Sequence, residues 1–306
     1  MNLSQVGETG LIQRFRRILG EGPGVIRGIG DDAAVLPYTQ KEYLLFATDA
    51  VREGVHFILK KGPFYTSPAT PYQIGWKALG INLSDIAAMG GIPRYAVVSL
   101  GATQNHPVSF YEGIMKGMKA MAKKFNVSVV GGDTDRTEKL SITVAILGTV
   151  EKKRCVFRSG AKPGDLIFVT GKLGGSRKGR HLTFTPRVKE ARILTKYFRL
   201  SAMIDISDGL AGDLAQICRE SRVGAVIGGK AVPLSKGATL ESALNDGEDF
   251  ELLFTLPPRE AGRLIMKRIR FEFPTTPIGR IVPKKEGIHI YIGNKKSPLT
   301  GGFRHF

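Results

Sequence analysis

The sequence predicts an α/β (α+β) protein of two domains. Its 306 residues are about twice the usual length of a single domain. Strand-like apolar runs and amphipathic helix patterns are mixed in both halves, and the pattern restarts after Cys155. The boundary is therefore expected between residues 150 and 162, which gives domains over 1–150 and 151–306.

The first half is expected to begin with a short helix that Thr9 caps and Gly20 ends. Glycine, proline and lysine are concentrated over 52–71, which predicts a mobile loop. Pro107 is typical of a helix start, and Gly90 of a helix end. The expected helices cover 9–19, 72–89 and 107–124, and the expected strands cover 33–36, 44–48, 95–101, 127–130 and 140–150.

The second half shows a new series of turn, strand and helix signals. A turn at Pro163-Gly164-Asp165 leads into an apolar strand, and Pro186 opens a helix. The expected strands cover 166–170, 223–227, 250–256 and 288–292, and the expected helices cover 186–198, 208–222 and 258–269.

The composition is that of a globular protein with a strongly basic balance. Lys+Arg 45 against Asp+Glu 27 leaves a net charge of +18, which suits polyanionic partners such as nucleotides or nucleic acids. The basic residues are spread along the whole chain without a nucleic-acid-binding signature, so most are expected to be solvated surface. Attraction of small polyanions such as nucleotides is a weaker interpretation, and nucleic acid stays open as the rival partner. No apolar run approaches the roughly 18 residues of a membrane span, the first residues are too charged for a signal peptide, and Cys155 and Cys218 form no disulfide framework. A soluble cytoplasmic protein is expected.

Short acidic groups stand out in this basic chain. Most are flanked by glycine, and several directly follow apolar strands, where α/β folds present ligand-binding groups. One such group alone is more often a plain turn, but five at element boundaries favour a shared site. The groups are Gly28–Ala33 with Asp31 and Asp32, Thr48-Asp49, Ser84-Asp85, Gly131–Asp135 and Asp205–Gly209.

Convergence of these carboxylates would require bound cations. Two carboxylates about 4 Å apart repel by about 4 kcal/mol at an effective dielectric constant of about 20. Carboxylates with Thr or Ser hydroxyls, without His or Cys, form a hard oxygen set that suits Mg²⁺. The sequence therefore predicts a magnesium site.

Common nucleotide-binding motifs do not explain these groups. Gly28–Ala33 fits the dinucleotide fingerprint G-x-G-x-x-A, but Asp31 and Asp32 would face the pyrophosphate and the following residues are strand-like. The chain has no P-loop of the form G-x-x-x-x-G-K-[ST]. A bound nucleotide would then depend on metal ions, backbone amides and Arg or Lys side chains.

The order and spacing of the motifs resemble those of the thiamine-monophosphate kinase family. The resemblance covers the chain from its first helix to the terminal Gly302-Phe303-Arg304-His305-Phe306. Family members often have Ser before the Thr-Asp pair, where this chain has Ala47, so Ala47 is left out of the site. The motifs that carry the resemblance are Gly28–Ala33, Thr48-Asp49, Asn82–Gly90, Gly131–Thr134, Arg158–Asp165, Asp205–Gly209 and Gly247–Glu251.

The resemblance implies a fold and a reaction. The amino-terminal domain would be a sheet with helices on one side that forms a homodimer through its sheet, with a mixed α/β carboxy-terminal domain packed beside it. ATP would lie between the domains and transfer its γ-phosphate in line to thiamine monophosphate, with several Mg²⁺ ions, giving thiamine diphosphate. Because the acceptor is a phosphate oxygen, no general base is expected.

The resemblance also assigns site residues. The magnesium ligands would be Asp32, Thr48, Asp49, Asp85, Asp133, Asp205 and Asp208. The ATP contacts would be Tyr111, Gly132, Asp133, Arg158 and Ser207. The thiamine monophosphate contacts would be His56, Glu248 and Phe303. Of these, Glu248 and the Phe303 ring suit a cationic thiazolium.

Alternative functions stay open. Another ATP-dependent synthetase of the same superfamily, similar to aminoimidazole ribonucleotide synthetase, would share the fold, although Gly247–Glu251 and the terminal residues fit a thiamine pocket better. A selenophosphate synthetase is disfavoured because the amino-terminal segment lacks a reactive cysteine. A basic nucleic-acid-binding protein is the rival from another class, and its binding would depend steeply on salt.

Overall fold

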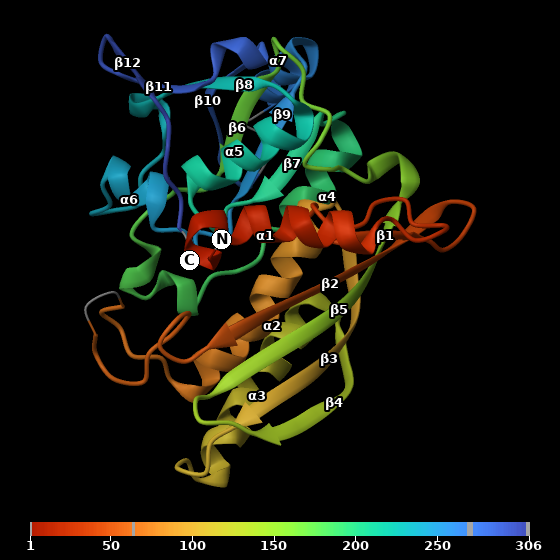
Figure 1. Cartoon of the computed structure of the whole chain (residues 1–306), viewed down its shortest axis with the longest axis vertical. Helices are drawn as coiled ribbons and strands as arrows, with labels where there is room; N and C mark the ends of the chain where they lie inside the picture. The colour runs from red at the N-terminus through yellow and green to blue at the C-terminus, as the bar shows by residue number, and fades with distance from the viewer. Residues whose placement is uncertain (1, 63–64, 268–271, 304–306) are drawn as a thin grey trace.

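The computed structural model describes residues 2–62, 65–267 and 272–303 and contains two β-sheets with helices packed against them (Figure 1). The predicted α/β (α+β) fold class is confirmed. The helices are α1 (Leu3–Leu19), α2 (Pro71–Ala88), α3 (Val108–Phe125), α4 (Val188–Tyr197), α5 (Leu210–Ser221), α6 (Leu240–Asn245) and α7 (Pro258–Lys267). The strands are β1 (Ala34–Pro37), β2 (Glu42–Arg52), β3 (Ile92–Ala102), β4 (Ser128–Arg136), β5 (Ser141–Glu151), β6 (Leu166–Thr170), β7 (Ala202–Asp205), β8 (Gly224–Gly228), β9 (Leu252–Leu256), β10 (Thr275–Val282), β11 (Ile288–Ile292) and β12 (Lys295–Pro298).

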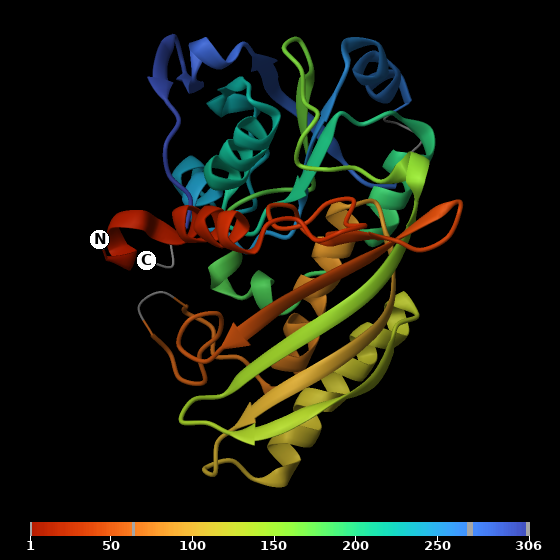
Figure 2. The same cartoon turned by 45° about the vertical axis from the view of Figure 1, so that its right-hand side comes forward.

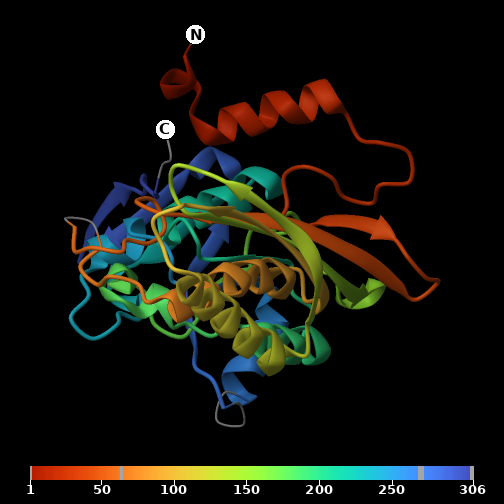
Figure 3. The same ribbon diagram turned by 90° about the horizontal axis from the view of Figure 1, so that it is seen from below.

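The first sheet has the strand order β1-β2-β5-β3-β4 and packs one face against α2 and α3 (Figure 2). Ile142, Val144 and Ile146 alternate along β5 and are fully buried on that face. The view from below shows α2 and α3 side by side against the sheet (Figure 3). The two helices approach closely because a Cβ atom at Gly75 or Gly117 would overlap the backbone of the other helix.

The opposite face of the first sheet is apolar and exposed. Phe46, Tyr95 and Val97 point to this face, and they are 46%, 54% and 44% exposed. Strand β4 forms the outer edge beside β3, and all of its residues are exposed. A contiguous apolar patch of this kind is typical of a protein–protein interface.

The second sheet has the strand order β12-β11-β8-β10-β6-β9-β7 and helices on both faces. Alternate side chains of β6 pack on opposite faces of the sheet, as the two-residue period of a strand requires. Ile167 and Val169 belong to the hydrophobic cluster around α5, whereas Phe168 belongs to the cluster that includes α4 and α7.

Helix α2 lies between the two halves of the molecule and contacts β7 and α4 as well as its own sheet. Most of its residues are buried, because the helix packs against neighbours on several sides, and this is why its sequence carries apolar side chains all around. Even so, no helix in the described part of the chain is both long and apolar enough to cross a membrane. The chain between residues 150 and 162 connects β5 to β6, and the division into domains 1–150 and 151–306 stays a prediction.

The structure corrects several local predictions. Thr9 is not an N-cap, because α1 begins at Leu3 after Asn2 and is interrupted at Gly7, whose φ is +64°. Asp49 and Asp133, expected just beyond the ends of predicted strands, lie inside β2 and β4, whereas Asp85 lies in α2, within the helix predicted over 72–89. Strands β7, β10 and β12 were not predicted, and in β10 a proline and a glycine interrupt the strand pattern.

Candidate functional site

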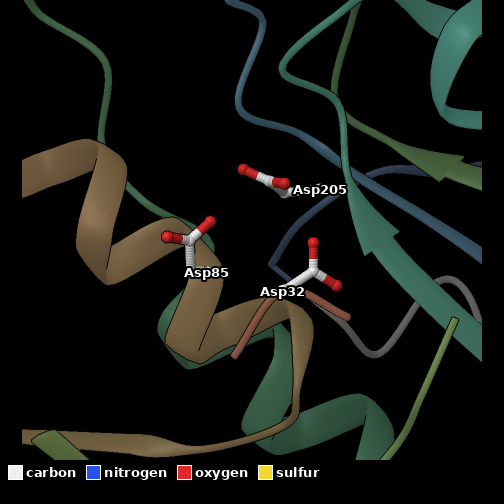
Figure 4. A group of neighbouring side chains, drawn as sticks. All are labelled: Asp32, Asp85 and Asp205. Atoms are coloured by element: carbon white, nitrogen blue, oxygen red, sulfur yellow. The ribbon is translucent and has the colours of Figure 1, made fainter. Parts of the chain in front are cut away.

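The structure brings together three of the predicted magnesium ligands. Asp32 precedes β1, Asp85 lies in α2 and Asp205 ends β7 (Figure 4). One carboxylate oxygen from each lies within 4.8 Å of the other two. We call these residues the carboxylate triad. Its members come from parts of the chain that are far apart in sequence, so the fold creates the cluster.

Asp32 and Asp205 are buried, Asp85 is half-buried, and the triad is electrostatically unfavourable without a cation. Burial and the Asp32 charge raise the pKa of Asp205 to about 7. Burial and the Asp205 charge raise the pKa of Asp85 well above its usual value. Arg158 offsets part of this charge through an ion pair from Nη2 to Asp32 Oδ1 at 2.7 Å.

The donor set fits Mg²⁺. All three groups offer carboxylate oxygens, the ligands that hard divalent cations prefer. The buried Oδ2 atom of Asp32 has no hydrogen-bond donor among the described residues, so it has the capacity to coordinate a cation. Ser84 Oγ donates a hydrogen bond to Asp205 Oδ2 at 2.6 Å and fixes that carboxylate.

A cavity of about 660 Å³ opens beside the triad. It is polar, and residues from both halves of the chain line it together with α1 residues such as Glu8 and Thr9. The predicted site residues that line it are Asp32, Thr48, Asp49, His56, Asp85, Arg158, Ser207, Asp208, Glu248 and Phe303. The structure thus gathers most of the predicted site, including residues assigned to metal, nucleotide and acceptor, around one cavity.

Hydrogen bonds orient the other predicted magnesium ligands that line the cavity, Thr48, Asp49 and Asp208. The Thr48 hydroxyl donates to the Val144 carbonyl at 3.0 Å, and the backbone N–H of Asp49 donates to Asn82 Oδ1 at 2.9 Å. The backbone N–H of Asp208 donates to Asp213 Oδ2 at 3.1 Å.

Asp213, a buried acid that was not predicted as a site residue, also lines the cavity. Burial and the Asp208 charge raise its pKa well above the usual value. The signal was its place in the first turn of a helix that begins just after Asp208, which puts it on the same side of the cavity.

The predicted acceptor residues lie together at another part of the cavity. Glu248 accepts hydrogen bonds from Tyr65 Oη at 3.0 Å and from Lys77 Nζ. The backbone N–H of Phe303 donates to the Asp208 carbonyl at 2.7 Å, which ties this aromatic residue to the metal side. The Arg177 guanidinium lies 5.1 Å from the centre of the Phe303 ring. Arg304, His305 and Phe306, part of the terminal motif, lie outside the described residues.

Three predicted nucleotide contacts lie away from this cavity. Asp49 pairs with Val144 across β2 and β5, and the same row continues through β3 to Gly132 on β4. Gly132 is therefore three strands, or about 14 Å, from Asp49. Asp133 sits on the same exposed edge strand, and the Tyr111 hydroxyl is hydrogen-bonded to the Thr103 backbone. None of the three lines the cavity.

Several known proteins similar to this chain along most of its length are thiamine-monophosphate kinases. The thiamine-monophosphate kinase of Aquifex aeolicus is 33% identical over an alignment 336 residues long, gaps included, which covers 100% of both chains. That of Rhodopirellula baltica is 38% identical over 278 residues, 85% of this chain and 84% of the relative. The chain belongs to the thiamine-monophosphate kinase family.

Domain-level and structural matches agree with the kinase family. Residues 30–150 match the N-terminal domain, and residues 141–292 the C-terminal domain, of the family described as AIR synthase related protein. A solved structure described as AaThiL complexed with AMPPCP and TMP superposes with a TM-score of 0.83 at 33% identity, covering 100% of this chain and 99% of that one. This member of the thiamine-monophosphate kinase family therefore shares its fold with that solved structure along the full chain, and the carboxylate triad lies within the shared fold.

Proposed function

We propose that the protein transfers the γ-phosphate of ATP to thiamine monophosphate, giving thiamine diphosphate and ADP in a magnesium-dependent reaction. The observation that carries the proposal is the carboxylate triad, of which Asp32 and Asp85 line a cavity that both halves of the chain enclose. Full-length similarity to thiamine-monophosphate kinases supports it, as does the solved relative described with AMPPCP and TMP. A cytoplasmic location is part of the same proposal.

The metal-binding residues belong to this proposal. Asp32, Asp85 and Asp205 would hold Mg²⁺, joined by Thr48, Asp49 and Asp208 from the cavity wall. Bound Mg²⁺ supplies charge neutralisation for a triphosphate, the main need of phosphoryl transfer between two anions. Arg158 and Ser207 line the same cavity and would contact the phosphates of ATP.

The acceptor end is proposed to bind the cationic thiamine portion. Glu248 offers a carboxylate and Phe303 an aromatic face, both suited to a thiazolium. His56, near the start of the segment after β2, also lines the cavity. These residues bind and orient the acceptor, whose phosphate oxygen attacks without a general base.

We propose that a second copy of the chain completes the nucleotide site. Asp133 pairs with Ser99 in the β3–β4 register, and both side chains point to the exposed apolar face with Tyr95 and Val97. A two-fold pairing through that face would place Asp133 of one copy against the other copy, and the proposal assigns Gly132 and Tyr111, which also lie outside the cavity of their own chain, to the same site.

Mixing two inactive variants tests this arrangement. A dimer of Asp133→Ala chains and a dimer of Asp85→Asn chains should each have no active site. If Asp133 acts across the interface, a mixed dimer has one intact site, formed by the Asp133→Ala chain's own Asp85 and its partner's Asp133. Random pairing makes about half of the dimers mixed, so about a quarter of the wild-type activity should return. Failure of the mixture to regain activity, with mixed dimers demonstrated by differential tagging, would place Asp133 in its own chain's site or in none.

The reaction itself is tested by incubating purified protein with Mg-ATP and thiamine monophosphate and separating the products by chromatography. Thiamine diphosphate and ADP should appear in equal amounts, and EDTA should stop their formation. Hydrolysis of ATP without thiamine diphosphate would instead favour another ATP-dependent synthetase of the superfamily. RNA binding with a steep salt dependence, in the absence of turnover, would favour the nucleic-acid alternative.

A further inference from the structure

A completely buried lysine stands beside the acceptor end of the cavity. Lys77 lies in α2 and is 0% exposed, an unusual environment for a residue that almost always faces water. Its Nζ donates to the His56 carbonyl at 2.5 Å and to Glu248 Oε1. Lys77 therefore joins two segments that carry proposed acceptor contacts, one from each half of the chain.

The segment that carries Glu248 is held in an unfavourable backbone conformation. Glu248 and Phe250 have φ values of +57° and +49°, in the left-handed region that non-glycine residues avoid. Surrounding groups fix this geometry. Ser176 Oγ donates to the Glu248 carbonyl at 2.5 Å, and the Phe250 ring stacks on Phe184 with their centres 4.2 Å apart.

Several charged groups surround the Glu248 carboxylate. Burial raises the pKa of Glu248, but the Lys77 charge and the Tyr65 hydrogen bond outweigh it and leave that pKa below its usual value. Burial lowers the pKa of Lys77, and the charges of Glu248 and of Asp49 on β2 oppose this shift and favour the charged form. The titratable groups that face this pair are Tyr65 from the segment after β2, Asp49 from β2, Arg177 and His181 from the segment after β6.

We propose that Lys77 is a positioning residue for the acceptor, which keeps the Glu248 carboxylate in place and negatively charged so that the cavity selects an acceptor with a cationic ring. This inference rests on the proposed function, in which Glu248 meets the thiazolium. Lys77 itself is buried and acts through Glu248.

The test compares Lys77→Met, Glu248→Gln and the double variant, with the exposed Lys119→Met on α3 as a matched control. Two acceptors are used: thiamine monophosphate and its deaza analogue, in which a neutral thiophene replaces the thiazolium. Each single variant should raise the KM for thiamine monophosphate about tenfold or more, with a smaller change in the KM for ATP. Preference for the cationic over the neutral acceptor should fall in both, and the Lys119→Met variant should match wild type.

The double variant decides the matter. If Lys77 acts through Glu248, adding Lys77→Met to Glu248→Gln changes the acceptor KM by less than about threefold, because the interaction is already lost. In Lys77→Met alone, the KM should fall again as the pH rises and Glu248 ionises. Multiplying effects, or an unchanged preference for the cationic ring, would overturn the proposal.

Thermal unfolding and binding of ATP to each variant show whether it is folded. The double variant Lys77→Met/Glu248→Gln buries no unpaired charge. If Lys77→Met alone does not fold, the double variant can therefore still be compared with Glu248→Gln. Absence of turnover in the wild-type protein would count against the proposed function itself and not against the role of Lys77.

Discussion

Replacing Asp85 with Asn should stabilise the metal-free protein while it destroys the site. The substitution removes a carboxylate whose oxygen lies within 4.8 Å of two others, and whose ionisation burial and the Asp205 charge oppose by raising its pKa well above the usual value. At that distance each ionised pair repels by about 3.5 kcal/mol at an effective dielectric constant of about 20. The Arg158 ion pair with Asp32, and a pKa of about 7 for Asp205, reduce the net gain to about 1–3 kcal/mol. For a chain of this size that gain corresponds to about 2–6 °C in Tm.

Calorimetry of wild type and Asp85→Asn, in EDTA and in Mg-ATP, measures both effects. Mg-ATP at about 100 times its Kd should stabilise the wild-type protein by about 2.7 kcal/mol and Asp85→Asn by far less. Glu286→Gln removes an exposed carboxylate outside the cavity and is the matched control. The reasoning is refuted if Asp85→Asn lowers the Tm in EDTA, or if it keeps the full response to Mg-ATP.

Three further outcomes are expected. The pKa of Asp205 is about 7 in the folded state and near 3.8 when unfolded, so its contribution to the stability of the metal-free protein is lost as the pH rises toward 7. Over the same change the carboxylate becomes available for Mg²⁺, so the stabilisation by Mg-ATP measured by calorimetry should grow between pH 6 and 8. Ser84→Ala removes the hydrogen bond to Asp205 and should weaken Mg²⁺ affinity about tenfold in a titration, a change of less than twofold arguing against it. Gly212→Ala adds a Cβ 3.3 Å from the Gly302 Cα and should raise the acceptor KM by displacing the adjoining Phe303, whereas Gly262→Ala, with nothing within 4 Å, should leave it unchanged.

Local patterns predicted much of the fold but less of its detail. Apolar periodicity located α2, α3 and the buried strand β5, whose side chains alternate between a helix-covered and an open face. It failed at β10, where Pro277 and Gly279 disrupt the pattern and only pairing with β6 and β8 sustains the strand. Neighbouring strands supply what the local sequence lacks.

The chemical types in the site were predictable, whereas their arrangement depended on contacts between distant parts of the chain. The gathering of Asp32, Asp85 and Asp205 was expected from their acidic motifs, and Asp85 lies in a helix that the apolar pattern also predicted. The distance between Asp49 and Gly132 follows from the strand order, which no local pattern reveals. No sequence pattern singled out Lys77, because its importance comes from its contact with Glu248, 171 residues away.

Anomalous diffraction from crystals grown with Mn²⁺ and a non-hydrolysable ATP analogue tests the metal site most directly. The account predicts a metal peak bridging phosphate oxygens and carboxylate oxygens of Asp32, Asp85 and Asp205, at ligand distances of about 2.1 Å. Nucleotide bound in the cavity with no metal at these three carboxylates, or metal bound only at a remote surface, would contradict it.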